Sequence, residues 1–258
     1  MSALIRLSGV ELSYPIYSIR AHSLRNTIAN LAIGGKLLKD GQDIIHVKAL
    51  DKVNFELGEG DRMGIIGHNG AGKSTLLKVI AGIYEPDRGR VEVTGRISSM
   101  IDISLGLDNS FTGRENMLNM GRMRGFSTKQ ILAKVDEIVE FSELGPYIDL
   151  PVKTYSAGMQ TRLVFAVATS LEPDILLLDE WIGAGDASFA DKAAQRMKDV
   201  LSRSRALVLA THNCSLIRNV CNKLLVLNGG SQEFFGEVKD WDFQQMVPMG
   251  AVAGAPLH

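Results

Sequence analysis

The chain has 258 residues, of which 45% are hydrophobic and 22% are charged, and its formal net charge is -1. These values indicate one globular domain, or one domain with an inserted subdomain, and they exclude a nucleic-acid binder that relies on bulk positive charge. No apolar run approaches the roughly 20 residues of a membrane span, and the N-terminus lacks a signal-peptide pattern. The two cysteines, Cys214 and Cys221, have no metal-ligand spacing, so we expect reduced thiols in a cytosolic chain.

Two strands are predicted in the first quarter of the chain. Residues 5–14 and 47–57 alternate apolar and polar side chains, and we expect them to pair as an antiparallel sheet. Between them, residues 19–39 place leucines and Ile28 at near-helical spacing, which predicts a short amphipathic helix. This helix would form most of an amphipathic insertion at about 18–46, between the two strands. It either packs on its own sheet or binds a partner.

A glycine-rich loop follows a short predicted strand over 62–66 and precedes a predicted helix over 76–81. It matches the phosphate-binding pattern of a glycine, any four residues, then Gly-Lys-Ser/Thr, and reads Gly67, His68, Asn69, Gly70, Ala71, Gly72, Lys73, Ser74 and Thr75. Such a loop wraps phosphates with backbone N–H groups and aims a helix N-terminus at them. We expect Lys73 to neutralise the terminal phosphates and Ser74 to bind Mg²⁺. The flanking strand and helix favour this reading over a glycine-rich turn with a chance lysine.

The middle of the chain turns helical after a strand region over 90–100 that is broken at Gly95. Residues 110–141 follow a helical pattern, in which Ser127 and Gln130 form a capping box ahead of an apolar stripe. This segment interrupts a series of parallel-strand units. We therefore assign residues 103–170, approximately, to an inserted helical subdomain.

After Pro173 the sequence returns to an α/β pattern. Continuous apolar runs over 175–178, 206–210 and 223–227 predict strands buried on both faces. Asn228 and Gly229 predict a hairpin turn into a last strand over 231–235. We expect one α/β domain over 1–246 and a flexible tail over 247–258.

Three polar residues at strand ends extend the predicted phosphate site. Asp179 ends the strand over 175–178, where open α/β sheets bind ligands, and is the expected partner of Ser74 in binding Mg²⁺. If the bound nucleotide is hydrolysed, Glu180 would orient or deprotonate the water that attacks the terminal phosphate. His212 ends the next buried strand and would donate a hydrogen bond to the γ-phosphate. The structural alternative for the two acids is a helix N-cap pair, and a lone histidine is often an ordinary polar residue.

A second anion-binding element is predicted at Tyr155–Met159, where Ser156 and Gly158 stand at a helix start. It lies far from the phosphate loop in sequence and belongs to the helical insert. One nucleotide rarely needs two such elements. Two copies arranged head to tail would use both, because each chain would complete the other's site.

Together these motifs resemble the nucleotide-binding subunit of an ATP-binding cassette (ABC) transporter over nearly the whole chain. The resemblance implies a P-loop NTPase ABC ATPase core with an antiparallel β subdomain and an inserted α-helical subdomain. It implies ATP and Mg²⁺ as cofactors, a homodimer and separate transmembrane permease subunits, with Lys73, Glu180 and His212 as catalytic residues. It further places Asp186 in a dimer-contacting loop, and makes Tyr14 or Tyr17 the aromatic residue that stacks on adenine.

Two stretches are similar to the polysaccharide-exporting branch of that family, which handles O-antigen, capsule and teichoic acid chains. Residues 155–159 read Tyr-Ser-Ala-Gly-Met instead of the usual Leu-Ser-Gly-Gly-Gln, and residues 102–116 also resemble this branch. Asp102 stands where most of the family has a glutamine that contacts Mg²⁺. The chain resembles the short form of this branch, without a C-terminal carbohydrate-binding domain, which implies that the polymer is recognised mainly by the membrane subunits. The resemblance places the ATPase at the cytoplasmic face of the inner membrane, bound peripherally.

Other functions stay open at the level of sequence. The ATPase subunit could serve another substrate, such as a small solute, a lipid or a drug. A soluble ABC ATPase of DNA repair or translation typically carries a long coiled coil or two cassettes in one chain, and neither is present here. A nucleotide-gated adaptor would bind ATP and hardly hydrolyse it, and the pairing of Glu180 with Asp179 argues against that reading.

Overall fold

The structure is a computed structural model, and it describes residues 3–16, 36–39, 45–101, 103–171, 173–180 and 187–243. Its strands are β1 (Ile5–Ile16), β2 (Lys36–Lys39), β3 (Ile45–Leu57), β4 (Arg62–Ile66), β5 (Arg88–Val93), β6 (Ile97–Ser99), β7 (Ile175–Asp179), β8 (Ala206–Ala210), β9 (Lys223–Asn228) and β10 (Ser231–Glu237). Its α-helices are α2 (Lys73–Ile80), α3 (Gly113–Met123), α4 (Thr128–Leu132), α5 (Val135–Ser142), α6 (Ala157–Ser170), α7 (Ala187–Arg203) and α8 (Cys214–Val220). Three short 3-10 helices are η1 (Gly145–Asp149), η2 (Val152–Thr154) and η3 (Val238–Asp240).

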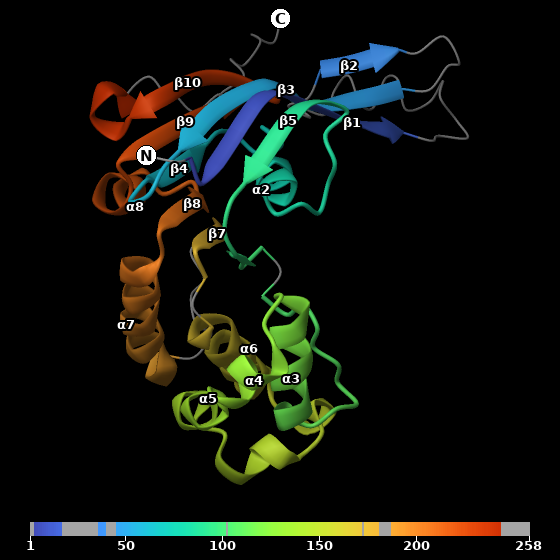
Figure 1. The fold of residues 1–258 in the computed structure, drawn as a ribbon, viewed down its shortest axis with the longest axis vertical. Coiled ribbons are helices and arrows are strands. Elements are labelled where there is room, and N and C mark those ends of the chain that lie inside the picture. Colours follow the sequence, from blue (N-terminus) through green and yellow to red (C-terminus); the bar gives the residue numbers. More distant parts are fainter. Residues whose placement is uncertain are drawn as a thin grey trace, which may run out of the picture.

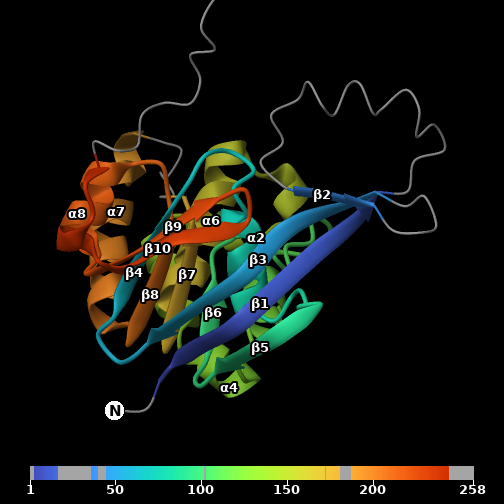
Figure 2. The ribbon, with the colours of Figure 1, turned by 90° about the horizontal axis from the view of Figure 1, so that it is seen from above.

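The strands form one sheet in the order β5-β1-β3-β10-β9-β4-β8-β7-β6, and β2 pairs with β3. Strands β6, β7, β8, β4 and β9 are parallel neighbours, whereas β1, β3 and β5 pair in the antiparallel sense. Figure 2 shows β1, β3 and β5 on one side of the molecule and α7 and α8 on the other. Because β4, β7 and β8 are parallel, their carboxyl ends meet at one edge of the sheet.

Among the described residues, three large apolar cores and one small one pack the helices and the sheet together. Helix α2 buries Leu77 between the antiparallel strands and one face of the parallel strands. Helices α7 and α8 cover the opposite face with Phe189 and Ile217. Helices α3, α5 and α6 share a separate core around Met120 and Leu163. In Figure 1 these helices form the lower part of the molecule, below the sheet.

Most of the predicted strands are confirmed, and the turn before β10 lies one residue later than predicted. Asn228 pairs with Ser231, so Gly229 and Gly230 are the two central residues of the hairpin, with φ of 53° and 82°. Two positive φ angles are what a tight hairpin turn of this twist requires, and glycine adopts them without a Cβ clash.

The helical pattern over 110–141 is confirmed and forms three helices, α3, α4 and α5. The capping box at the start of α4 is confirmed: the Ser127 hydroxyl accepts from the Gln130 N–H at 3.3 Å, and the Ser127 N–H donates to Gln130 Oε1 at 3.0 Å. Helices α3 to α6 lie inside the predicted range of 103–170.

The helix predicted over 19–39 is wrong for its last four residues. Lys36–Lys39 forms β2, which pairs antiparallel with β3 so that Leu37 lies opposite Val47. This pairing depends on a partner strand outside the segment itself, and such a contact overrides local helical spacing. The remaining positions of the predicted helix, Tyr17 and the predicted tail over 247–258 lie outside the described residues.

The expectations about membrane spans and about the two cysteines can be compared with the structure. Within the described ranges, no helix combines the length and the apolar character needed to cross a membrane. Both cysteines are free, and burial raises the pKa of the Cys221 thiol to about 12, against a smaller opposing effect of Arg62. A thiol with so high a pKa is protonated at neutral pH and therefore a poor nucleophile.

Candidate functional site

The phosphate loop joins the end of β4 to the start of α2, as predicted. Gly72 is the N-cap residue of α2 with φ of 101°, and a Cβ on it would lie 2.5 Å from the Ala49 carbonyl oxygen of β3. The Gly230 N–H donates to the Ala71 carbonyl at 3.1 Å, so the β9–β10 hairpin also contacts the loop. The sheet thus holds the loop on two sides, and α2 begins with its free N–H groups at the loop.

Lys73 is held against the loop it belongs to. Its Nζ donates to the Gly67 carbonyl at 2.7 Å and to the His68 carbonyl at 3.0 Å, and the residue is only 9% exposed. Burial lowers the pKa of Lys73, and the negative charges of Asp179 and Glu180 act in the opposite direction. The two carboxylates at the end of β7 are therefore close enough to stabilise the positive charge of Lys73.

The acidic pair lies at the end of β7, next to β8. Asp179 pairs with Ala210 in the parallel register, and the Glu180 N–H donates to the Ala210 carbonyl at 2.8 Å. The Glu180 Oε1 accepts a hydrogen bond from the Thr211 hydroxyl at 2.6 Å. The backbone of Glu180 has a φ of 71°, which is unusual for a residue with a Cβ. His212 follows directly and is exposed.

Thr211 was missed by reasoning from sequence. It is fully buried, and besides donating to Glu180 its hydroxyl accepts from the Asn213 N–H at 3.1 Å. The signal for it lies in the register between β7 and β8. If Asp179 pairs with Ala210, the residues that follow each of them must be adjacent.

His68 also has contacts that the loop motif does not reveal. Its Nδ1 lies 2.7 Å from the Asn69 carbonyl oxygen, and its Nε2 lies 3.1 Å from Asn228 Oδ1 at the β9–β10 turn. The Asn228 side-chain amide donates to Glu233 on β10. Side-chain contacts thus tie the exposed part of the phosphate loop to the hairpin.

Tyr14, on β1, lies beside the helix that follows the loop. Its hydroxyl donates to Thr75 Oγ1 at 3.4 Å, and its ring meets Tyr84 edge to face with centroids 5.7 Å apart. Burial raises the pKa of Tyr14, and the bond to Thr75 opposes that shift. Three predicted site residues lie outside the part of the chain that the structure describes: Tyr17, Asp102 and Asp186.

Ser156 and Gly158 do not join this site. Ser156 is the N-cap of α6, and its hydroxyl accepts from the Met159 N–H at 3.2 Å. Figure 1 places α6 in the lower, helical part of the molecule, away from α2. The chain therefore brings together Lys73, Asp179 and Glu180 and leaves the second anion-binding element apart from them.

The unusual tyrosine of this element has a structural role. Tyr155 is buried among the helices, and its hydroxyl donates to the Tyr147 carbonyl at 2.6 Å. A Cβ on Gly113 would lie 2.5 Å from that hydroxyl oxygen, so glycine at 113 leaves room for Tyr155. The two stretches that resemble the polysaccharide-exporting branch therefore pack against each other.

The oxygen groups at the loop suit Mg²⁺. The hydroxyl of Ser74, which is exposed on the first turn of α2, and the carboxylate of Asp179 are the ligand types that Mg²⁺ takes together with phosphate oxygens. Among the described residues there is no group of three or more histidines, cysteines or acids that would hold a metal without such phosphates.

Comparison with known proteins decides the family. Residues 50–183, which include the phosphate loop, both acids and the second anion-binding element, match the model of the ABC transporter family. The chain belongs to the ABC transporter family. It is an ATPase of that family and binds ATP, and the predicted fold class is confirmed.

Several relatives have names that describe an export system. The chain is 44% identical, over 89% of its length and 96% of the relative, to the O-antigen export system ATP-binding protein RfbE of Yersinia enterocolitica. It is 43% identical to RfbB of Myxococcus xanthus, of the same description, and 40% identical to the teichoic acids export ATP-binding protein TagH of Lactococcus lactis. These two matches cover 74% of this chain but only 44% and 41% of the relatives, so the chain spans less than half the length of those two proteins.

Solved structures agree on the fold. An ATP-binding subunit of an ABC transporter superposes with a TM-score of 0.67 at 20% identity, covering 92% of this chain and 91% of that one. A dimeric ATP-binding cassette in a post-hydrolysis state, bound to ADP and Pi, gives a TM-score of 0.63 at 21% identity, covering 91% and 98%.

Proposed function

We propose that this ABC ATPase powers the export of a polysaccharide, such as O-antigen, capsule or a similar glycan, through separate transmembrane subunits. The observation that carries the proposal is the 44% identity to an O-antigen export ATP-binding protein over nearly the full length of both chains. The teichoic acid export relatives support the same substrate class. In this proposal the ATPase binds peripherally at the cytoplasmic face of the inner membrane.

The phosphate loop would hold the triphosphate of ATP. The N–H groups of the loop and of the first turn of α2 would bind the phosphates, and Lys73 would neutralise their charge. Ser74 and Asp179 would hold Mg²⁺, which supplies charge neutralisation on the β- and γ-phosphates when it is bound. We also propose that Tyr14 or Tyr17 stacks on the adenine, and that Asp102 is a further metal ligand.

Glu180 would act on the attacking water. Its carboxylate accepts a proton from the water as the oxygen bonds to the γ-phosphorus and the bond to the β-phosphate oxygen breaks, which releases ADP and phosphate. The hydrogen bond from Thr211 restricts the rotation of that carboxylate. His212, one residue further on, would donate a hydrogen bond to the γ-phosphate.

Ser156 and Gly158 would act on the nucleotide of a second copy. Their position in the helical part, away from the phosphate loop, supports a homodimer in which each α6 N-terminus completes the partner's site. Asp186 would lie in the dimer contact. The transmembrane subunits would recognise the polymer.

The experiment is to purify the ATPase together with its multispan partner from detergent-solubilised membranes. We expect a bound glycan and ATP hydrolysis that Glu180→Gln abolishes while ATP binding persists. Glu140→Gln is the matched control, because Glu140 is exposed on α5, away from β7, and loses the same charge. Normal turnover by Glu180→Gln, or a co-purified partner that carries a lipid or drug instead of a glycan, would contradict the proposal.

A further inference from the structure

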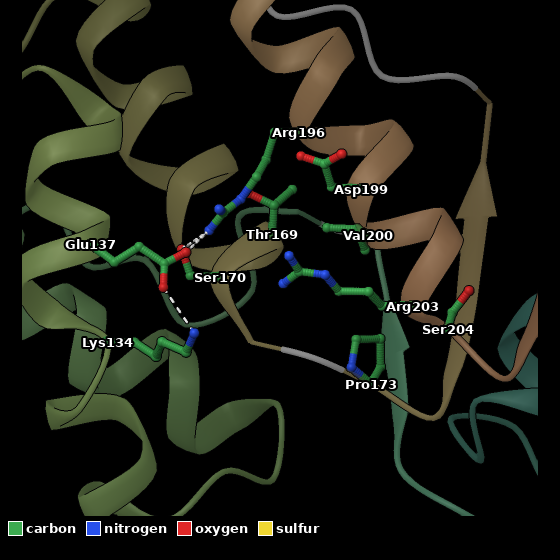
Figure 3. A pocket seen from close by; sticks show the side chains of 10 residues that line it. All are labelled: Lys134, Glu137, Thr169, Ser170, Pro173, Arg196, Asp199, Val200, Arg203 and Ser204. Carbon is green, nitrogen blue, oxygen red and sulfur yellow. Dashed lines mark hydrogen bonds and ion pairs between the residues drawn. The ribbon is translucent and has the colours of Figure 1, made fainter.

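Two polar contacts, one of them through α5, join α7 to α6, the helix that begins at the second anion-binding element and is called the signature helix below. The first contact lies at the C-terminal end of α6. Arg196 of α7 donates to the Ser170 hydroxyl at 2.9 Å and also pairs with Glu137 of α5. Lys134 donates to the other oxygen of Glu137 at 2.8 Å. Figure 3 shows Arg196 reaching from α7 to Glu137 and Ser170, with Lys134 below them.

The acid at this contact stays ionised. Burial raises the pKa of Glu137, but its bonds to Lys134 and Arg196 lower it by more, and the net shift is downward. The guanidinium of Arg196 also lies over the ring of Phe141, at 5.1 Å from its centroid. Arg196 is therefore fixed by α5 while it contacts the last residue of α6.

The second contact lies near the N-terminal end of α6 and runs through Glu143. One carboxylate oxygen of Glu143 accepts from Lys192 of α7 at 2.6 Å, and the other accepts from Arg162 of α6 at 3.0 Å. Glu143 is the C-cap residue of α5 with φ of 56°, a left-handed conformation that is unfavourable for a residue with a Cβ. Glu143, Arg162, Ser156 and Gly158 line the same pocket of about 310 Å³.

The two contacts are far enough apart to determine the direction of α6. Arg162 and Ser170 are eight residues apart, which is about 12 Å along a helix. Between them, Phe165 of α6 packs edge to face on Phe189 of α7 at 6.1 Å. The buried apolar side chains of α6 hold the helix in the cores, and the two polar contacts restrain it further in its two halves.

We propose that α7 is a two-point clamp that positions the signature helix for the partner's nucleotide, with Lys192, Glu143 and Arg196 as positioning residues. The inference rests on the proposed function, in which Ser156 and Gly158 complete the site of a second copy. Helix α7 begins at Ala187, so the clamp lies close in sequence to Glu180, the proposed hydrolytic carboxylate.

The contact through Lys192 adds little to stability. The side chains of Lys192 and Glu143 are 39% and 49% exposed, and ion pairs that exposed contribute little to the free energy of unfolding. Substitution of Lys192 therefore tests position rather than folding. The matched control is Lys198→Met, because Lys198 is exposed on the same helix and its spacing places it on a different face from Lys192 and Arg196.

The experiment measures ATP-driven dimerisation of the full chain in a Glu180→Gln background, ATP binding by the single chain, and Tm. We expect Lys192→Met to weaken dimerisation about three- to tenfold, with unchanged single-chain ATP affinity and a Tm shift below about 3 °C. Lys192→Arg should restore dimerisation, and Lys198→Met should leave it unchanged. Ser170→Ala, which removes the other contact but keeps the Arg196–Glu137 pair, should have a similar effect. The double variant should fall below either single one, because each contact restrains a different half of α6.

Gly158→Asp separates the failure of the clamp from the failure of the proposed function. If Gly158→Asp weakens dimerisation and neither Lys192→Met nor Ser170→Ala does, the clamp is overturned and the shared site stands. If none of the three weakens it, both are overturned. Weakening that comes with an equal loss of single-chain ATP affinity and of Tm, or that Lys192→Arg does not restore, would also overturn the clamp.

Discussion

At the scale of single residues, the site follows from where strands end and from which strands are neighbours. Asp179, Glu180 and His212 were predictable because buried apolar runs end at them, and the C-terminal edge of a parallel sheet is where ligands bind. The contact of Thr211 with Glu180 was not predictable in the same way. It depends on the pairing of β7 with β8, which joins positions 31 residues apart.

Thr211→Val should reduce ATP hydrolysis and leave ATP binding intact. Valine has nearly the shape of threonine but cannot donate to Glu180, so the carboxylate loses its fixed orientation. We expect a kcat about tenfold lower, with a free energy of unfolding reduced by about 1–2 kcal/mol, because the Asn213 N–H also loses its acceptor. Steady-state hydrolysis, fluorescent-nucleotide binding and urea unfolding measure the three effects.

Thr211→Ser is the matched control, because it keeps the hydroxyl and should keep most of the turnover. A Thr211→Val enzyme with the wild-type kcat would show that the hydrogen bond to Glu180 does not matter for hydrolysis.

At the scale of elements, local signals predicted where helices begin better than how segments pair. Ser127 and Gln130 marked the start of α4, since a capping box depends only on residues three apart. Strand β2 was predicted as helix because its four residues owe their conformation to β3. The contacts of α7 in the clamp could not be predicted from sequence either, because Lys192 and Glu143 are 49 residues apart.

The capping box of α3 predicts a pH-dependent stability. Thr112 donates its N–H and its hydroxyl to Glu115 Oε2 at 2.8 and 2.9 Å, and these bonds lower the pKa of Glu115 in the folded chain. A folded pKa below the unfolded one stabilises the fold above the unfolded pKa, and this contribution is lost as pH falls through the folded pKa. Glu115→Gln should therefore be less stable than wild type at about pH 7, and the difference should shrink near pH 4 and below.

Urea unfolding of both chains at the two pH values measures this difference. Glu140→Gln on α5 is the control for loss of one exposed charge and should show no such trend. An equal deficit of Glu115→Gln at both pH values would contradict the assignment of the effect to the ionised carboxylate.

At the scale of the whole molecule, one chain holds two anion-binding elements that it does not bring together. The phosphate loop lies at the edge of the sheet, and Ser156 begins a helix in the lower part of Figure 1. The sequence predicted both elements from their glycines and helix starts. Their separation follows from the packing of α3, α5 and α6 into a core of their own. That separation is the structural reason to expect a site shared between two copies.

Mixing two inactive variants tests the shared site directly. Lys73→Met disables the phosphate loop of its own chain, and Gly158→Asp places a carboxylate at the α6 N-terminus, where it would repel phosphate. If sites are shared, a mixed dimer has one site with both defects and one with neither. If each chain holds its own complete site, every site in the mixture has a defect. Random mixing at equal amounts makes half of the dimers mixed, so a shared site should restore about a quarter of the wild-type hydrolysis rate, measured after the variants are co-expressed or exchanged. A mixture no more active than its two parent variants would mean that Ser156 and Gly158 do not complete the partner's site.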